Sequence, residues 1–140
     1  MSQQTTKDAI DAIFNQVAQY NQRHDTSKPL FFDTETTGGD REDQIIEIAF
    51  CDSDRNVIID TLIYTDRPCH PEAFKVHGIQ PHELVGKPTF VDIQPAIVQL
   101  LKARTLYAYN ASFDIRMMRQ SDHQLRLQQV DVKCLCKQFA

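Results

Sequence analysis

The sequence predicts an α/β fold in one domain. Three strand-like segments follow one another between residues 30 and 64, and segments with helical spacing lie before and after them. A further short strand separates two of the later helices. The chain has 140 residues, 41% hydrophobic and 24% charged, which suits one globular unit with a buried core.

The first element is an amphipathic helix over about residues 5–22. Ile10, Ile13, Phe14 and Val17 fall at i, i+3, i+4 and i+7, so they share one helix face. A polar stretch ending in Pro29 then breaks the pattern. We therefore divide the chain into a helical extension with linker, residues 1–28, and a main domain, residues 29–140.

The main domain begins with an antiparallel meander. Its strands are predicted at about 30–36, 44–52 and 56–64, the last two joined by a short polar turn. Four prolines between residues 68 and 88 then mark an irregular region. The remaining predicted elements are a short helix near 71–77, a helix at 92–103 with Pro95 in its first turn, a strand at 105–109, a helix at 111–124 and a last helix starting near 131.

The sequence gives no sign of a membrane span or an export signal, so a cytoplasmic location is expected. Without a CxxC pair, the four cysteines are expected as reduced thiols. A zinc site from Cys69, His70, His77 and His82 is a weaker alternative, because their spacing matches no tetrahedral template.

The net charge of −4 is unevenly distributed. Residues 1–100 carry 8 Lys and Arg against 16 Asp and Glu, whereas residues 101–140 carry 7 against 3. The basic C-terminal part could hold a phosphodiester backbone or could simply be a solvated helix face. The acidic part does not exclude nucleic acid, because a site for divalent cations is itself rich in carboxylates.

Two short motifs carry the candidate chemistry. In Asp33-Thr34-Glu35 the two acids lie at i and i+2 of a strand, so both project from one face and could bind a divalent cation. In Asn110-Ala111-Ser112-Phe113-Asp114, the asparagine is a candidate N-cap and the aspartate lies in the first helical turn. Taken alone, the first motif is more often a solvated strand end, and the second is more often an ordinary helix start.

Their order along the chain resembles one enzyme family. DTETTG on a first strand, a three-strand meander, a helix, and a strand ending in NASFD are similar to the DnaQ-like branch of the DEDD exonucleases, which includes the epsilon subunit of bacterial DNA polymerase. The HGI stretch at 77–79 and GKPTF at 86–90 resemble the same branch. The resemblance covers roughly residues 29–139.

The resemblance implies a ribonuclease H-like mixed sheet, with the first strand beside the fourth, that gathers Asp33, Glu35 and Asp114. These acids would bind two Mg²⁺ or Mn²⁺ ions and catalyse 3'-5' hydrolysis of single-stranded DNA or RNA to nucleoside 5'-monophosphates. The implied substrate-binding residues are Thr34, Thr36, His77, Asn110, Ala111 and Phe113. Phe113 could instead be a core residue, and His77 a local helix cap.

The family's third motif, HxxxxD or YxxxD, has no match after Asp114, where Asp122 and Asp131 are the only acids. We expect a C-terminally truncated domain whose activity is weak or absent, because a general base is worth ~10²–10⁴-fold in rate. An uncovered sheet face would favour a protein partner or self-association. The alternative function is a non-catalytic remnant that binds nucleic acid or protein.

Overall fold

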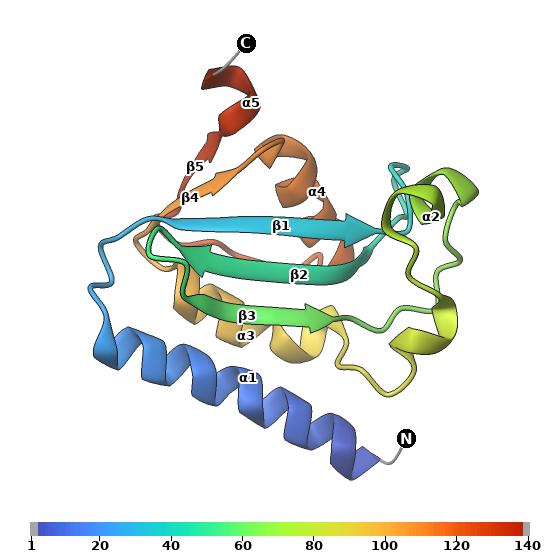
Figure 1. Cartoon of the computed structure of the whole chain (residues 1–140), viewed down its shortest axis with the longest axis horizontal. Coiled ribbons are helices and arrows are strands. Elements are labelled where there is room, and N and C mark those ends of the chain that lie inside the picture. Colours follow the sequence, from blue (N-terminus) through green and yellow to red (C-terminus); the bar gives the residue numbers. More distant parts are fainter. Residues whose placement is uncertain (1–2, 139–140) are drawn as a thin grey trace.

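The computed structural model describes residues 3–138 and contains one mixed five-stranded sheet with the order β3-β2-β1-β4-β5 (Figure 1). The α/β class and the mixed, ribonuclease H-like sheet are therefore confirmed. The strands are β1 (Leu30–Thr36), β2 (Ile45–Asp52), β3 (Val57–Leu62), β4 (Thr105–Ala108) and β5 (Asp131–Cys134). The helices are α1 (Gln3–Arg23), α2 (Pro71–His77), the 3₁₀ helix η1 (Pro81–Leu84), α3 (Phe90–Leu101), α4 (Ala111–Ser121) and α5 (Leu135–Gln138).

The central strand β1 pairs antiparallel with β2 and parallel with β4. Its side chains alternate, so Leu30, Phe32, Thr34 and Thr36 are buried while Asp33 is exposed. Parallel pairing places the ends of β1 and β4 at the same edge of the sheet. The turn from β4 into α4 therefore lies beside the end of β1.

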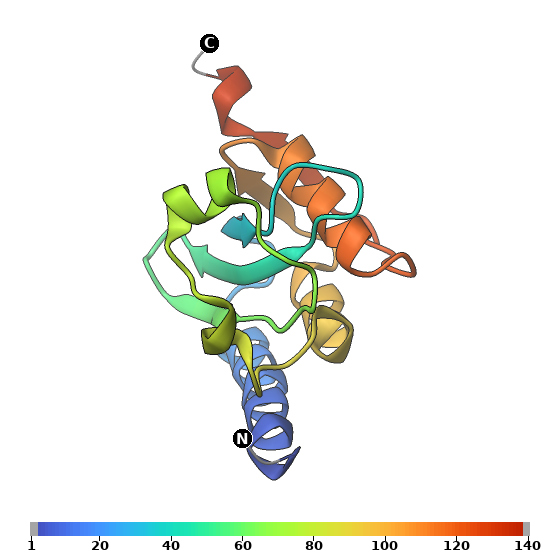
Figure 2. The same ribbon diagram turned by 90° about the vertical axis from the view of Figure 1, so that its right-hand side faces the viewer.

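Helices α3 and α4 cover one face of this sheet, as Figure 2 shows, and α2 lies beyond the end of β1. Buried apolar residues of α1, α3, α4 and the strands form one core cluster. On the opposite face, the rings of Phe31 and Tyr107 stack with centroids 5.3 Å apart. No helix long and apolar enough to cross a membrane occurs between residues 3 and 138.

Helix α1 is joined to the sheet by a buried hydrogen bond as well as by its apolar face. Ile13, Val17 and Tyr20 are buried, and the Tyr20 hydroxyl donates to Asp52 at 2.7 Å. Burial raises the pKa of Asp52, but hydrogen bonds from Asn56, Tyr20 and two backbone N–H groups outweigh it and lower the value to about 2. Asp52 thus stays ionised inside the fold.

Three predicted helices differ from the structure. Residues 131–134 form β5, not a helix, because Val132 and Cys134 alternate onto the core while Asp131 and Lys133 are exposed. Helix α4 ends at Ser121, where Asp122 leaves the helical region and its carboxylate accepts the N–H of Gln124. A capping box of Thr89 and Asp92 starts α3 at Phe90, so Pro95 lies inside the helix, not in its first turn.

Arg104 is the largest fully buried side chain and connects three segments of the chain. Its guanidinium donates to the Leu100 carbonyl at 2.7 Å, the Lys28 carbonyl at 3.0 Å and the Asn21 side chain at 3.0 Å. It also lies over the ring of Tyr20, 5.5 Å from the centroid. The buried charge is thus satisfied by oxygen acceptors and an aromatic face.

We predict that Arg104→Ala lowers the free energy of unfolding by ~3 kcal/mol, because it removes packing and leaves buried acceptors without donors. Urea denaturation followed by circular dichroism measures the change. The exposed neighbour Lys102 provides the control, and Lys102→Ala should cost less than ~0.5 kcal/mol. Equal costs for the two variants would contradict this account of Arg104.

Candidate functional site

The strand β1 carries Asp33 and Glu35 on the face of the sheet opposite to α3 and α4. Asp33 is exposed and Glu35 is half-buried, whereas Thr34 between them is buried on the helix side. The period-two alternation predicted from the sequence is therefore present. The two carboxylates lie in the C-terminal half of β1, close to the end where the chain leaves the strand.

Asp114 reaches the same edge from α4. It lies in the first turn of that helix, is only 6% exposed, and accepts a hydrogen bond from the Thr34 hydroxyl at 2.5 Å. These two residues are 80 positions apart in the sequence. One hydrogen bond thus joins the first motif to the second.

The three acids influence one another electrostatically. Burial, followed by the charge of Asp33, raises the pKa of Glu35, and Asp114 contributes to the same shift. Burial raises the pKa of Asp114 to about 6, with Asp33 adding to the rise and the Thr34 hydrogen bond opposing it. Within residues 3–138, none of these carboxylates forms an ion pair with Lys, Arg or His.

The carboxylate oxygens of Asp33, Glu35 and Asp114 are not close enough together to meet the distance criterion for a shared metal ion. Among the residues that the structure describes, the one trio of ligand-type side chains with donor atoms within 4.8 Å of one another is Asp40, Asp43 and His70. Asp33, Glu35 and Asp114 form no such trio. The weaker zinc alternative is likewise absent from these trios, although Cys69 Sγ lies 3.4 Å from His77 Nε2.

Glu47 is a further carboxylate beside the site that sequence reasoning missed. It lies opposite Glu35 in the β1–β2 register and is half-buried. Burial raises its pKa, and the charges of Asp60 and Asp33 add to the shift. Its position between two buried isoleucines in the IIEIAF segment could have predicted its face, but only the strand register brings it next to Glu35.

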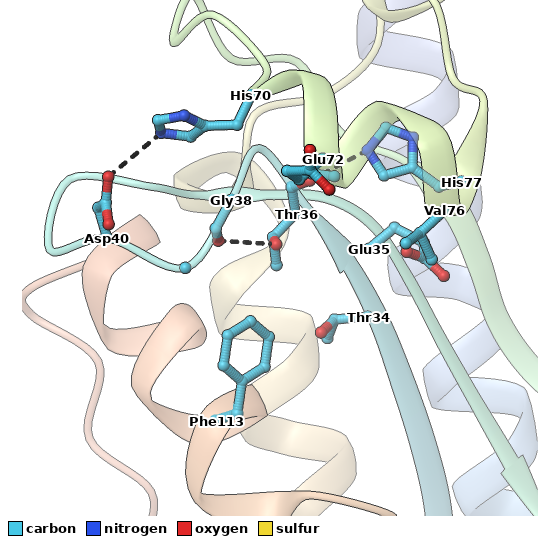
Figure 3. A pocket seen from close by; sticks show the side chains of 12 residues that line it. Thr34, Glu35, Thr36, Gly38, Asp40, His70, Glu72, Val76, His77 and Phe113 are labelled. Atoms are coloured by element: carbon cyan, nitrogen blue, oxygen red, sulfur yellow. Dashed lines mark hydrogen bonds and ion pairs between the residues drawn. The ribbon is translucent and has the colours of Figure 1, made fainter.

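A cavity of about 430 Å³ lies beside Glu35 and is shown in Figure 3. Five of the predicted residues line it: Thr34, Glu35, Thr36, His77 and Phe113. Asp33, Asp114, Asn110 and Ala111 are not in its lining. Asn110 occupies the N-cap of α4 but makes no capping hydrogen bond with its side chain, and Ala111 is buried.

His77 holds the end of β1 against α2. Its Nδ1 accepts the N–H of Ile79 at 3.0 Å, so its Nε2 carries the proton and donates to the Thr36 carbonyl at 3.1 Å. Gly78 follows at a left-handed φ of 66°, which ends α2. Both ring nitrogens have local partners, and the substrate contact of His77 stays a prediction.

Asp43 anchors the loop that follows β1. Fully buried, it accepts hydrogen bonds from the Thr37 hydroxyl, the Asp40 N–H and Arg67. A Cβ on Gly38 would lie 2.6 Å from the Asp43 carboxylate and 2.3 Å from the His70 ring, so only glycine fits there. The glycine of DTETTG thus lets this loop pack closely against Asp43.

The third motif has no counterpart in the described residues after Asp114. Asp122 caps the C-terminal end of α4, and Asp131 is exposed at the start of β5. His123 lies in the turn beyond α4, and its side chain is exposed. These residues do not supply a fourth motif-type carboxylate or a base to the candidate site.

A family model and the sequences of known proteins both place this chain among exonucleases. The family model described as "Exonuclease" matches residues 30–137. The chain is 35% identical over 92 residues to an uncharacterized exonuclease of Escherichia phage 186, covering 66% of this chain and 47% of that protein. It is 42% identical over 91 residues to the DNA polymerase III subunit epsilon of Treponema pallidum, covering 62% and 42%.

Solved structures agree in fold. A product-bound exonuclease I superposes with a TM-score of 0.65 at 23% identity, covering 81% of this chain and 31% of that one. Exonuclease X in complex with 5' overhanging duplex DNA gives a TM-score of 0.58 at 29% identity, covering 76% and 58%.

The chain spans somewhat less than half the length of these curated relatives. The matched region nevertheless runs from β1 to α5 and includes both acidic motifs. The chain therefore belongs to the exonuclease family, in its DnaQ-like branch.

Proposed function

We propose that this chain carries part of the active site of a divalent-metal-dependent 3'-5' exonuclease that releases nucleoside 5'-monophosphates from single-stranded DNA or RNA. The observation that carries the proposal is the Thr34–Asp114 hydrogen bond, because it brings the second acidic motif to the strand of the first. The cavity of about 430 Å³ beside them would receive the 3'-terminal nucleotide.

The donor set suits Mg²⁺ or Mn²⁺. Asp33, Glu35 and Asp114 offer hard oxygen ligands, and Glu47 adds another on the neighbouring strand. None of the three acids has an ion-pair partner among residues 3–138, and a divalent ion would relieve their mutual repulsion. When bound, such ions would activate water and stabilise charge on the scissile phosphate.

The other residues would position substrate and ligands. Thr34 holds the Asp114 carboxylate, and His77 holds the Thr36 carbonyl at the cavity wall. The Phe113 ring lies at the cavity, where a base could stack on it (Figure 3). A general base is the component without a candidate in this chain, so we expect its rate to be ~10²–10⁴-fold below that of a complete site.

The first experiment measures release of mononucleotides from a 3'-labelled single-stranded oligonucleotide in Mn²⁺. The chain should release them slowly, and Asp33→Asn should reduce the rate by about 10²-fold or more. Asp54→Asn is the matched control, because Asp54 is an exposed carboxylate in the turn between β2 and β3, outside the motifs. Comparable rates for Asp33→Asn and the unmodified chain would refute the catalytic role.

The same measurement tests the alternative function, a non-catalytic remnant of the exonuclease fold. The residues of this chain after Asp114 contain neither HxxxxD nor YxxxD, so experiment has to separate the two functions. Binding of the oligonucleotide with no release in either variant would support it.

Glu47→Gln provides a separate prediction. If Glu47 contributes to the electrostatic field that attracts the ions, its substitution should raise the Mn²⁺ concentration needed for half-maximal binding by roughly 3–10-fold. Titration calorimetry measures this affinity without relying on turnover. An unchanged affinity would exclude Glu47 from the metal site.

The raised pKa of Asp114 predicts that the free energy of unfolding of the metal-free chain depends on pH. Its pKa is about 6 in the fold against 3.8 in the reference state, so the folded chain binds the proton more tightly. The associated stability is complete below pH 3.8 and is lost as the pH rises through about 6, by up to ~3 kcal/mol.

We therefore expect Asp114→Asn to be more stable than the unmodified chain at pH 7.5, with the difference shrinking as the pH falls toward 4. Thermal unfolding in EDTA measures this difference, and Asp54→Asn, at an exposed position, should show a much smaller effect. A stabilisation by Asp114→Asn that grows as the pH falls would contradict the assigned direction of the pKa shift.

A further inference from the structure

We propose that Arg41 and Arg116 form a subsite for the phosphodiester backbone of the single strand, next to the pocket for its terminal nucleotide. This inference rests on the proposed function and extends it to a second point of contact with the substrate. It assigns a function to arginines that lie outside both acidic motifs.

The subsite is a second cavity of about 620 Å³ on the loop between β1 and β2. Its lining residues are Gly39, Asp40, Arg41, Glu42, Arg67 and Arg116. Gly39 and Asp40 also line the first cavity, so the two hollows meet at this loop. A strand with its 3' nucleotide in the first cavity would have the second one beside it.

Two of the three arginines in this cavity retain an uncompensated charge. Arg67 pairs with Glu42 at 3.0 Å and with Asp43 at 3.2 Å, which neutralises it. Arg41 and Arg116 have no ion pair among residues 3–138. Their guanidinium groups are therefore available for an anion.

The acids in the lining are already engaged. Glu42 is bound by Arg67, and Asp40 lies 3.3 Å from Nε2 of His70. Figure 3 shows Asp40 paired with His70 on the far side of the loop from Phe113. The pairing with Arg67 reduces the repulsion that Glu42 would exert on an incoming phosphate.

Arg116 is held in place before any substrate binds. It donates to the Gly39 carbonyl at 3.1 Å and to the Gln120 side chain at 2.9 Å, which uses two of its five N–H groups. Gln120 in turn donates to the carbonyls of Asp40 and Asp43 at 3.0 and 2.7 Å. Helix α4 and the loop are thus fixed against each other, which limits the entropy lost when a phosphate binds.

Phe113 connects the two cavities. The Arg116 guanidinium lies over its ring, 5.5 Å from the centroid, and the ring itself lines the first cavity. An aromatic ring for base stacking and a cation for phosphate pairing are thus adjacent on one helix. This combination is typical of single-strand binding without sequence preference.

The test compares the double variant Arg41→Gln/Arg116→Gln with the unmodified chain. Fluorescence anisotropy measures binding of a labelled oligothymidylate with hydrolysis-resistant phosphorothioate linkages in Mg²⁺. Affinity in 50 mM salt should fall by about 10-fold or more, and the slope of log affinity against log salt should fall by about 1.4, or 0.7 per lost contact. Binding of thymidine 5'-monophosphate should stay unchanged.

The matched control is Arg119→Gln/Arg126→Gln, which removes two exposed arginines that line neither cavity. Equal losses in the two double variants, or no loss in Arg41→Gln/Arg116→Gln, would overturn the subsite. If the unmodified chain binds the mononucleotide but the two arginines make no difference, the inference fails alone. If it binds neither ligand, the proposed function fails with it.

Discussion

The structure depends on the parallel pairing of β1 with β4. Leu30 lies opposite Leu106 and Phe31 opposite Tyr107, so the chain leaves both strands at the same edge of the sheet. Every feature of the candidate site follows from that edge: α4 begins there, Asp114 reaches Thr34, and the loop after β1 packs along α4. An antiparallel β4 would send α4 away from the acids of β1.

The same arrangement explains why acidic and basic groups coexist at one edge. The acids lie on strands and on the first helical turn, whereas Arg116 lies on the exposed side of α4. Arg116 and Gln120 donate to the Gly39 and Asp43 carbonyls, so the basic side of α4 is bound to the loop that follows β1. Under the proposed function, the backbone of a polyanion would meet the cations and its terminal nucleotide would meet the carboxylates.

The sequence was sufficient for the elements with strong periodicity. The period-two pattern of β1 to β3 and the 3.6-residue pattern of α1 were correct, and the resemblance correctly placed the first strand beside the fourth. It was insufficient for β5, because four residues with two apolar positions look equally like the start of a helix when α5 follows directly. The core contact of Val132 decides between the two, and it is a tertiary interaction.

The candidate site likewise contains residues that the sequence could predict and residues that it could not. The motifs located Asp33, Glu35 and Asp114, but Glu47 became visible only through the register of β2 against β1. Arg41 and Arg116 could not be grouped from sequence, since 75 positions separate them and the fold of the loop at Asp43 brings them to one cavity. Motifs identify ligand types, whereas loop conformation determines which charges face them.

The buried guanidinium of Arg104 also bears on how this domain can be shortened. The family match begins at residue 30, yet two of the acceptors of Arg104, on Asn21 and Lys28, precede that point. A version cut to the matched region would lose these two acceptors and the Tyr20 ring, and would keep only the Leu100 carbonyl among the Arg104 contacts described above. The N-terminal helix thus shares both the apolar core and the buried contacts of Arg104 with the sheet, and a shortened domain would have to replace both.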